Sequence, residues 1–285
     1  MDNLSTLLEA SLPTPIVKQA FLAKGHIGSL YTLHTQKKAF VLKTSYTHPQ
    51  YLALEAKMLQ DLQAYGIDTP RVIVQHETML LTEYISSVSH STQTKELFAA
   101  QILAKLHHVS NDARMYGYYY NTPIAFMTQN NEQTQYSWAF FLAQLRILPL
   151  AKQCYEKNAI SKKMLTQIET LCRNLYTYLD VANIYPSLIH GDLWRGNILF
   201  EKEHATLIDP ALYFADKEME LAFIAMNHTF GETFFQAYHE QHPISATFYT
   251  SKIYIYQIYP LLLHELLYPS KYIEKLKRVL EKLKL

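Results

Sequence analysis

The segment at residues 189–210 contains three polar side chains whose types and spacing could transfer a phosphoryl group. Asn197 follows Asp192 by five residues, and Asp209 follows Asp192 by 17. A carboxylate at the first position can orient an acceptor hydroxyl and take its proton. An amide oxygen and a second carboxylate can bind Mg²⁺, which prefers oxygen ligands while it bridges ATP phosphates. We therefore predict Asp192 as the catalytic residue and Asn197 and Asp209 as metal ligands.

A plain structural interpretation of the same segment is that His190-Gly191-Asp192 and Asp209-Pro210 are turns. A single His-Gly-Asp sequence would favour that interpretation. The spacing to Asn197 and the second aspartate is instead typical of a kinase catalytic loop followed by a short β-hairpin. The 13 histidines include no His-Glu-x-x-His pair, so we predict no histidine metal site.

Two charged residues upstream could complete a nucleotide site. Lys43 ends a strand-like run, the position from which a kinase lysine reaches the α- and β-phosphates. Glu55 lies twelve residues later, on the helical pattern that follows, and could pair with Lys43. Alone, each would be interpreted as an exposed strand end or a solvated helix face. Together they are typical of the small lobe of a kinase.

The residues ahead of the first strand-like run form a glycine-poor loop, Gly25-His26-Ile27-Gly28-Ser29. Phosphate-binding loops often have three glycines, and this loop has two. Its backbone N–H groups at Gly28 and Ser29, with the Ser29 hydroxyl, could cover phosphates. A turn before the strand is the alternative.

The apolar run at residues 80–85 leads into a segment at 86–94 with six Ser or Thr residues. In a two-lobed kinase such a run is the hinge. We predict that the backbone groups of Glu83, Tyr84 and Ile85 bind adenine and that Val41 packs against the adenine face. An ordinary core strand is the alternative, and both can hold because a hinge is partly core.

The elements that position these residues can be read from the hydrophobic pattern. A β-hairpin with strands at 30–35 and 39–43 surrounds the polar turn Gln36-Lys37-Lys38. A helix from about residue 50, which Gly66 ends, is indicated by apolar residues at helical spacing, namely Leu52, Ala56, Leu59 and Leu62. Two further strand-like runs lie at 71–74 and 79–85, and a short amphipathic helix is predicted at 4–10.

Beyond residue 94 most of the chain shows helical patterns. Helices are predicted at about 95–109, 134–155, 161–180, 217–240, 246–268 and 270–284. The strand-like exception, 188–212, carries the polar residues described above. We predict an α+β, protein-kinase-like fold with two lobes, a small β-rich N-terminal lobe at 1–85 and a larger, mainly helical C-terminal lobe at 86–285. The amphipathic stripe at 271–285 would close the larger lobe, and a membrane or partner helix is the alternative.

The composition excludes several classes of protein. Hydrophobic residues make up 49% and charged residues 18%, so the chain can bury a core and is not a disordered protein. With 26 basic and 25 acidic residues, no global field would draw the chain to nucleic acid or an acidic membrane. Two cysteines without a Cys-x-x-Cys pair, a start without a basic signal region and short apolar runs predict a cytoplasmic protein.

Several segments resemble the fructosamine-3-kinase (ketosamine-3-kinase) family, within the superfamily that contains aminoglycoside phosphotransferases and choline kinases. The sequence H-G-D-L-W-R-G-N at 190–197, followed by I-D-P-A at 208–211, is the most specific of them. The segments Y-F-A-D-K-E-M-E-L-A at 213–222 and L-A-K-L-H at 103–107 also agree. The departures are Ala215, where the family commonly has Gly, and Glu220, where it has Asp.

The resemblance implies an ATP- and Mg²⁺-dependent kinase that phosphorylates the sugar O3 hydroxyl of ketosamines, the sugar adducts of amines and protein lysines. The phosphorylated product is unstable and releases the amine, so the activity amounts to deglycation. Small ketosamines or glycated proteins are the implied partners, and the sugar, the amine and the oligomeric state stay open. The alternatives are a phosphotransferase for an aminoglycoside, choline or a sugar, and a nucleotide-binding regulator without transfer activity.

Three further residues could contact the acceptor. Trp194 lies two residues after Asp192 and could stack on the sugar or pack against the neighbouring strands. Asp216 and Glu218 could contact a cationic amine. Their alternative is a pair of charges at a helix N-terminus, where the helix dipole favours them.

Overall fold

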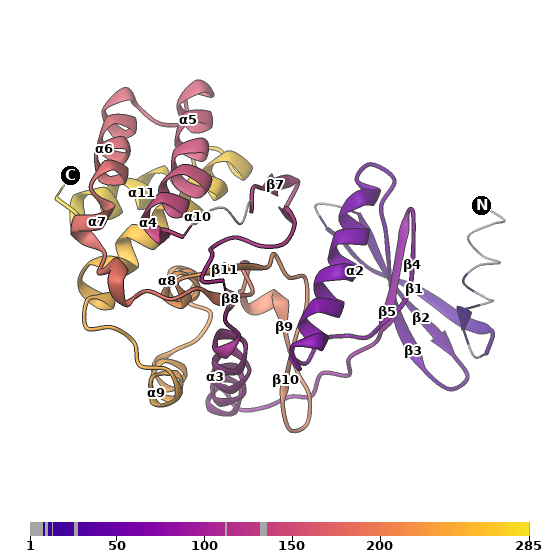
Figure 1. Cartoon of the computed structure of the whole chain (residues 1–285). Helices are drawn as coiled ribbons and strands as arrows, with labels where there is room; N and C mark the ends of the chain where they lie inside the picture. Colours follow the sequence, from indigo (N-terminus) through magenta and orange to yellow (C-terminus); the bar gives the residue numbers. More distant parts are fainter. Residues whose placement is uncertain are drawn as a thin grey trace.

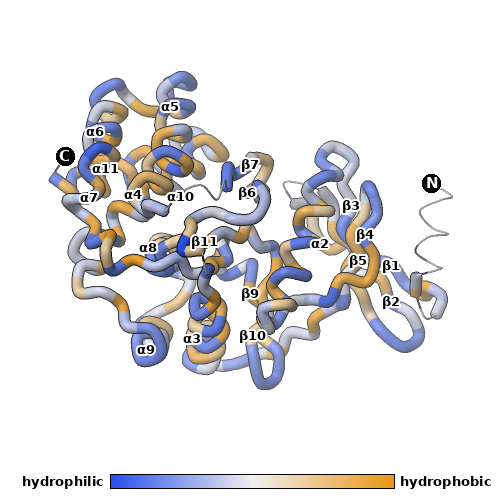
Figure 2. The backbone as a smooth tube through the Cα atoms, in the orientation of Figure 1, coloured by the Kyte–Doolittle hydropathy of each residue, from blue (hydrophilic) through white to orange (hydrophobic). Residues whose placement is uncertain are grey.

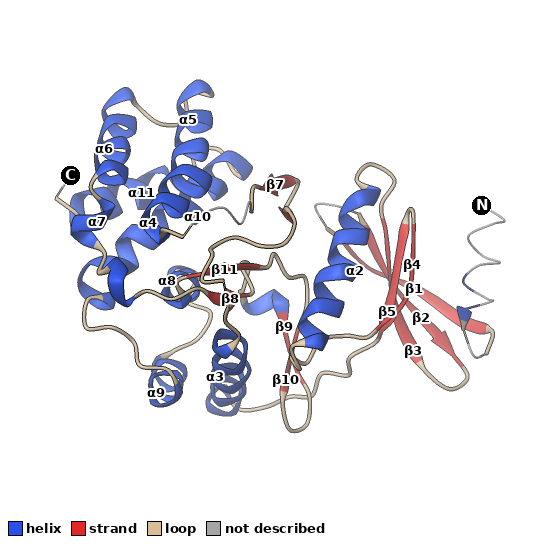
Figure 3. Ribbon diagram, viewed as in Figure 1, coloured by secondary structure: helices blue, strands red, loops and turns tan. Residues whose placement is uncertain are grey.

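The structure of the protein is a computed structural model, which describes residues 8, 11–12, 14–25, 28–111, 113–131 and 136–284. Its elements form two lobes, a sheet with one helix and a larger helical body (Figures 1 and 3). The helix predicted at 4–10 lies, except for Leu8, outside the described residues.

The small lobe is built on a five-stranded antiparallel sheet with the strand order β1-β2-β3-β5-β4. Its strands are β1 (Ile16–Lys24), β2 (Ser29–Thr35), β3 (Ala39–Thr44), β4 (Val72–His76) and β5 (Met79–Glu83). The predicted hairpin and the two later strands are confirmed. Sequence analysis misses β1, because most of its side chains are exposed and its apolar and polar residues do not alternate.

The two faces of this sheet bury different residues, and this alternation positions Lys43. Phe40 and Leu42 pack on one face with Leu33. Successive side chains of a strand point to opposite faces, so Lys43 lies on the other face, level with Leu80 of β5. Helix α2 (Pro49–Ala64) covers that second face, on the side toward the helical lobe (Figure 1). The predicted helix is therefore confirmed, and it lies beside the lysine.

The large lobe is mainly helical, with short strands beside its central helices. The helical segments are α3 (Thr92–His108), α4 (Trp138–Phe141), η1 (Leu142–Ile147), α5 (Leu148–Glu156), α6 (Lys162–Arg173), α7 (Leu175–Tyr178), η2 (Val181–Asn183), η3 (Arg195–Asn197), α8 (Lys217–Met226), α9 (Glu232–Gln241), η4 (Phe248–Lys252), α10 (Ile253–Leu267) and α11 (Ile273–Lys282). The strands are β6 (Thr122–Ile124), β7 (Met127–Gln129), β8 (Ser187–Ile189), β9 (Ile198–Phe200), β10 (Ala205–Leu207) and β11 (Tyr213–Ala215).

The strand-like segment predicted at 188–212 is confirmed for β8, β9 and β10, and the partner of β8, β11, begins just after it at Tyr213. β9 and β10 form an antiparallel hairpin, and β8 pairs with β11. The polar residues of interest lie in the loops between these strands. In Figure 2 the apolar β5 is orange and the turn between β9 and β10, Glu201–His204, is blue, so the hairpin presents a polar tip.

The prediction of one long helix at 217–240 is wrong, because the chain there forms two helices, α8 and α9. The break contains His228 with a positive φ of 48°, a conformation that interrupts helical hydrogen bonding. Gly231 then stands as the N-cap of α9. The β6–β7 hairpin was not predicted from the sequence either, because its strands have only three residues each.

The chain passes from β5 to α3 through residues 84–91, where Val88 N donates a hydrogen bond to Phe200 O at 2.8 Å. The predicted lobe boundary between residues 85 and 86 falls in this segment and stays a prediction. Within the described part of the chain, no helix has the length and apolar character needed to cross a membrane. The cytoplasmic location also stays a prediction.

Candidate active site

A cavity of about 660 Å³ lies between residues of the sheet and α2 on one side and loops and helices of the large lobe on the other. Most of the residues predicted for the site line it: Gly28, Ser29, Lys43, Glu55, Asp192, Trp194, Asn197 and Asp209. The folded chain therefore gathers residues that are up to 181 positions apart in sequence (209 minus 28). A cavity of this size is typical of small-molecule sites.

Lys43 joins the two lobes through its ammonium group. Its Nζ donates to Glu55 Oε1 on α2 at 2.5 Å and also to Asp209 Oδ1. Burial alone would lower the pKa of Lys43, but the two carboxylates hold that pKa above its ordinary value. Burial raises the pKa of Glu55, whereas Lys43 outweighs burial and lowers the pKa of Asp209. The predicted lysine–glutamate pair is present, with Asp209 as a further partner.

Asp209 has an unusual backbone conformation that follows from its position after the β9–β10 hairpin. Its φ is +53°, in the left-handed region. Residues other than Gly rarely adopt this conformation, although Asp tolerates it better than most. The preceding residue is held in place, because Ile208 N donates to Asn197 O at 3.1 Å. The Asp209 side chain keeps 43% of its surface accessible, toward the cavity.

Asp192 lies in a loop that hydrogen bonds hold from both ends. Asn197 Nδ2 donates to Asp192 O at 2.8 Å and to Asp192 Oδ2 at 3.2 Å. His190 Nε2 lies 2.9 Å from Ile208 O, next to Asp209. Gly191 has a φ of +82°, and a Cβ there would lie 2.2 Å from Ala211 O. The bend before Asp192 therefore requires glycine.

The electrostatics of Asp192 suit proton transfer. Burial and, to a smaller extent, the nearby Asp209 carboxylate together raise the pKa of Asp192 to about 8, against the lowering effect of Asn197. A carboxyl group whose pKa lies near neutral pH can accept a proton from a reacting hydroxyl more effectively than one with the ordinary value.

Sequence reasoning missed the residues that hold this loop from behind. Glu220 on α8 accepts hydrogen bonds from His190 N at 2.9 Å and Gly191 N at 2.8 Å. His107 on α3 lies 3.1 Å from Glu220 Oε2 through Nε2, and its Nδ1 lies 2.6 Å from Tyr238 OH. Burial would raise the pKa of Glu220, but His107 and the loop hold it below its ordinary value. The signals in the sequence were the acidic residue at position 220 and the L-A-K-L-H segment that ends at His107.

The four residues predicted to bind adenine are not among those that line the cavity: Val41, Glu83, Tyr84 and Ile85. Tyr84 N donates to Ala39 O at 3.3 Å, and the Glu83 carboxylate accepts Arg71 N at 2.9 Å. Their contact with adenine stays a prediction. Apolar residues that were not predicted as part of the site, such as Leu30, Leu52 and Met58, line the cavity instead.

Trp194 lines the cavity and keeps 47% of its surface exposed. Its ring also covers the loop, because a Cβ on Gly196 would lie 2.4 Å from Trp194 Cη2. Both interpretations of this residue, packing against the loop and offering a face to a sugar, are compatible with this position. Stacking on a sugar stays a prediction.

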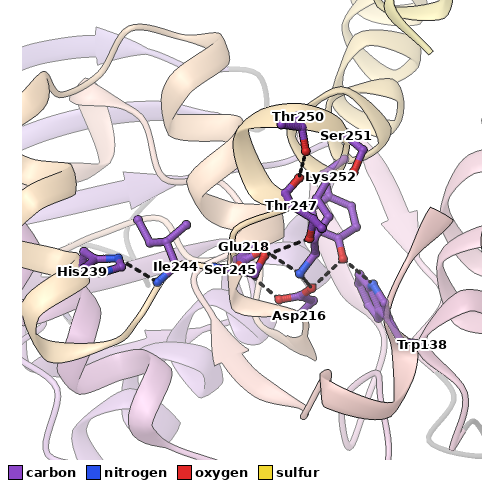
Figure 4. Close-up of polar contacts among 11 residues, drawn as sticks. Trp138, Asp216, Glu218, His239, Ile244, Ser245, Thr247, Thr250, Ser251 and Lys252 are labelled. Atoms are coloured by element: carbon purple, nitrogen blue, oxygen red, sulfur yellow. Dashed lines mark hydrogen bonds and ion pairs between the residues drawn. The ribbon is translucent and has the colours of Figure 1, made fainter. Parts of the chain in front are cut away.

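The predicted contact of Asp216 and Glu218 with a cationic amine needs correction. Neither residue lines the cavity, and both are buried, with 4% and 3% of their surface exposed. Figure 4 shows both carboxylates directed at the ammonium of Lys252, whose Nζ lies 2.7 Å from Asp216 Oδ2 and 2.5 Å from Glu218 Oε2. Asp216 also caps α8, accepting Glu218 N at 3.0 Å. Lys252 therefore compensates their negative charge inside the lobe.

The described residues include no group of three or more His, Cys, Asp or Glu around a possible metal position. This does not exclude Mg²⁺ at a phosphoryl-transfer site, since Mg²⁺ there keeps waters and phosphates and takes one or two protein ligands. Asn197 and Asp209 line one cavity and offer an amide oxygen and a carboxylate. The donor set fits Mg²⁺ bound together with a nucleotide.

Comparison with known proteins gives one family over the whole length. A family model described as Fructosamine kinase matches residues 1–285. A protein of Lactiplantibacillus plantarum named probable ketoamine kinase is 28% identical over 95% of this chain and 96% of its own. Protein-ribulosamine 3-kinase of Arabidopsis thaliana is 28% identical over 93% of this chain and 82% of its own.

Solved structures confirm the predicted two-lobed, kinase-like fold. A candidate fructosamine-3-kinase from Haemophilus somnus has a TM-score of 0.84 at 23% identity, covering 98% of this chain and 96% of its own. An ADP-bound aminoglycoside phosphotransferase has a TM-score of 0.69 at 15% identity, covering 98% and 97%. At these identities the structural likeness is evidence for the fold alone.

Proposed function

Because this chain belongs to the fructosamine kinase family, we propose that it transfers the γ-phosphoryl group of ATP to a sugar hydroxyl of a ketosamine. The family model over the whole chain supports this function, together with the single site where Lys43, Asp192 and Asp209 meet. The name of the Arabidopsis relative, a 3-kinase of ribulosamines, supports the C3 hydroxyl as the acceptor. Phosphorylation there would release the amine and so reverse glycation.

Lys43 supplies the positive charge for the nucleotide. We infer that its ammonium contacts the α- and β-phosphates while Glu55 keeps it in the cavity. The backbone at Gly28 and the Ser29 hydroxyl lie at the same cavity and would cover the phosphates from the sheet side. Because Lys43 already pairs with Asp209, part of the phosphate-binding geometry exists before ATP arrives.

Asn197 and Asp209 would hold Mg²⁺. The ion, when bound, would neutralise phosphate charge that builds up during transfer. Asn197 also donates to Asp192. The residue that would bind the metal therefore also positions Asp192, which would bind the acceptor hydroxyl. The chain contributes this positioning whether or not the nucleotide is present.

Asp192 would accept the proton of the attacking hydroxyl. Its carboxyl is held by Asn197 on one side, and its loop is held by Glu220 on the other. Most of the rate acceleration would come from orienting the hydroxyl and the γ-phosphate in line.

The experiment that tests this function is a comparison of matched aspartate variants with Mg-ATP and a lysine ketosamine. We expect Asp192→Asn and Asp209→Asn each to abolish turnover and to keep the wild-type circular dichroism spectrum. Asp180→Asn is the control, since Asp180 is exposed and bonds only locally to Asn183. Ordinary phosphorylation by the Asp192 variant would remove the basis for its role as proton acceptor.

The same experiment separates the alternatives. Turnover of kanamycin or choline without turnover of a ketosamine would favour another phosphotransferase of the superfamily. ATP that is bound but never consumed with any acceptor would favour a regulatory role. The family match over all 285 residues does not favour either alternative.

A further inference from the structure

The cavity continues past the catalytic loop to a second group of residues that the proposed chemistry does not use. We call this group the distal wall and define it as Phe223, His264, Tyr268, Lys271 and Tyr272, all of which line the cavity. They come from α8, from the end of α10 and from the loop between α10 and α11. An acceptor bound at Asp192 would extend toward this wall.

Three rings of the distal wall form a flat stack. The His264 ring is nearly parallel to the Phe223 ring, with centroids 6.1 Å apart and 14° between the planes, and to the Tyr272 ring, at 4.8 Å and 21°. Burial lowers the pKa of His264, which disfavours a positive charge on its ring. The stack therefore offers aromatic surface on which a positive charge is disfavoured.

Hydrogen bonds to a buried carboxylate hold the loop at 268–272. Glu265 is buried, with 2% of its surface exposed, and its two oxygens accept Ser270 N at 2.6 Å and Tyr272 N at 2.8 Å. Lys271 N also donates to Tyr268 O at 3.2 Å. The backbone that carries Lys271 is therefore fixed at the edge of the cavity before any substrate binds.

The charge of the distal wall is positive. The cavity-lining residues between Phe223 and Tyr272 include no aspartate or glutamate in the described part of the chain. Lys271 is exposed, and it forms no ion pair with any carboxylate of the described residues. Its Nζ lies 5.7 Å from the Tyr268 ring centroid. An ammonium that no carboxylate neutralises is suited to an anionic group on an otherwise apolar ligand.

We propose that the distal wall binds the amine-bearing part of the acceptor, and that Lys271 favours ketosamines in which this part carries a carboxylate. Ketosamines of free amino acids have such a group. A polycationic amino sugar would place ammonium groups against Lys271 and the apolar stack, so the wall disfavours it. This inference rests on the proposed function, because it assumes that a ketosamine occupies the cavity.

The test uses two acceptors that differ by one charge, the same sugar joined to the ε-amine of Nα-acetyl-lysine or of Nα-acetyl-lysinamide. We expect the wild-type kcat/KM to be about two- to fivefold higher for the carboxylate, the range for one exposed ion pair. Lys271→Met should bring the ratio near one, Lys271→Glu should invert it, and Lys271→Arg should keep it. Lys275→Met is the matched control, because Lys275 also lies near a ring, 5.5 Å from the Tyr272 centroid, but does not line the cavity.

The outcomes separate the inference from the function on which it rests. If neither acceptor gains phosphate, the proposed function fails. If both acceptors react with the same kcat/KM in the wild type and in Lys271→Met, the role of the distal wall is overturned and the kinase function stands. A loss of preference in Lys275→Met equal to that in Lys271→Met would also overturn it, since the effect would then come from general surface charge.

Discussion

Replacing Lys252 by Met should destabilise the large lobe far more than its one positive charge suggests. Lys252 is the shared partner of Asp216 and Glu218, with N···O distances of 2.7 and 2.5 Å (Figure 4). At most 6% of each of the three side chains is exposed. Burial alone would lower the pKa of Lys252, but the two carboxylates hold it above its ordinary value. The substitution leaves two buried carboxylates without their cation.

The size of the effect follows from the contacts that remain. Removing one member of a buried ion pair typically costs about 3–5 kcal/mol. Here Tyr256 OH still donates to Asp216 at 2.5 Å, and Ser245 donates to Glu218 through N at 2.6 Å and Oγ at 2.8 Å. These neutral donors satisfy part of the lost bonding but none of the lost charge. We therefore expect a loss of about 3 kcal/mol in the free energy of unfolding.

A second lysine with the same kind of contact provides the control. Lys277 lies 2.6 Å from Glu274, but the two side chains are 48% and 69% exposed. An exposed pair contributes about 0.2–1 kcal/mol, so Lys277→Met should cost less than about 1 kcal/mol. Urea unfolding followed by circular dichroism measures both variants. Equal losses in the two variants would refute the reasoning, because distance and not burial would then decide the energy.

Three further perturbations test the site and its surroundings. Glu220→Gln should lower kcat about a hundredfold in steady-state assays, because an amide donor would face a loop N–H and shift the catalytic loop; an unchanged kcat would contradict this. Gly28→Ala should raise the KM for ATP, because its Cβ would lie 1.9 Å from Thr44 O, whereas Gly25→Ala, with 3.8 Å to its nearest neighbour, should not. Burial is the main cause that lowers the pKa of His242 from 6.5 to about 4. As the pH falls, His242 therefore takes up a proton in the unfolded chain before it does so in the folded protein. Stability is thus lost between pH 6.5 and 4, and His242→Gln should flatten the fall in Tm over that window; a parallel curve would refute this.

The residues of the catalytic loop could be predicted from the sequence because short covalent spacings fix their relations. Asp192 and Asn197 belong to one loop, and Asp209 follows the hairpin next to it. Lys43 and Glu55 lie on a strand and the helix that follows it. Local chain geometry brings each of these sets close together. The spacing of the residues in the sequence was therefore enough to predict that they meet.

The residues that support the loop could not be predicted in the same way, because their partners are distant in sequence. Glu220 is 113 positions from His107, and its role depends on the tertiary fold that brings His107 of α3 to Glu220 of α8. The sequence left Asp216 open between an amine contact and a helix N-terminus, and its ion pair could not be predicted because Lys252, 36 positions later (252 minus 216), lies on another helix. A charge pattern near a helix start is compatible with either a ligand contact or a buried ion pair, and only the tertiary fold distinguishes the two.

The most direct test of the central claim is whether purified protein, supplied with Mg-ATP and a lysine ketosamine, transfers phosphate to the sugar. The account predicts a phosphorylated ketosamine, with the phosphate located on the C3 oxygen by NMR, and release of free lysine as that product decays. Consumption of ATP with aminoglycosides only, or a phosphate found on another sugar oxygen, would contradict the account.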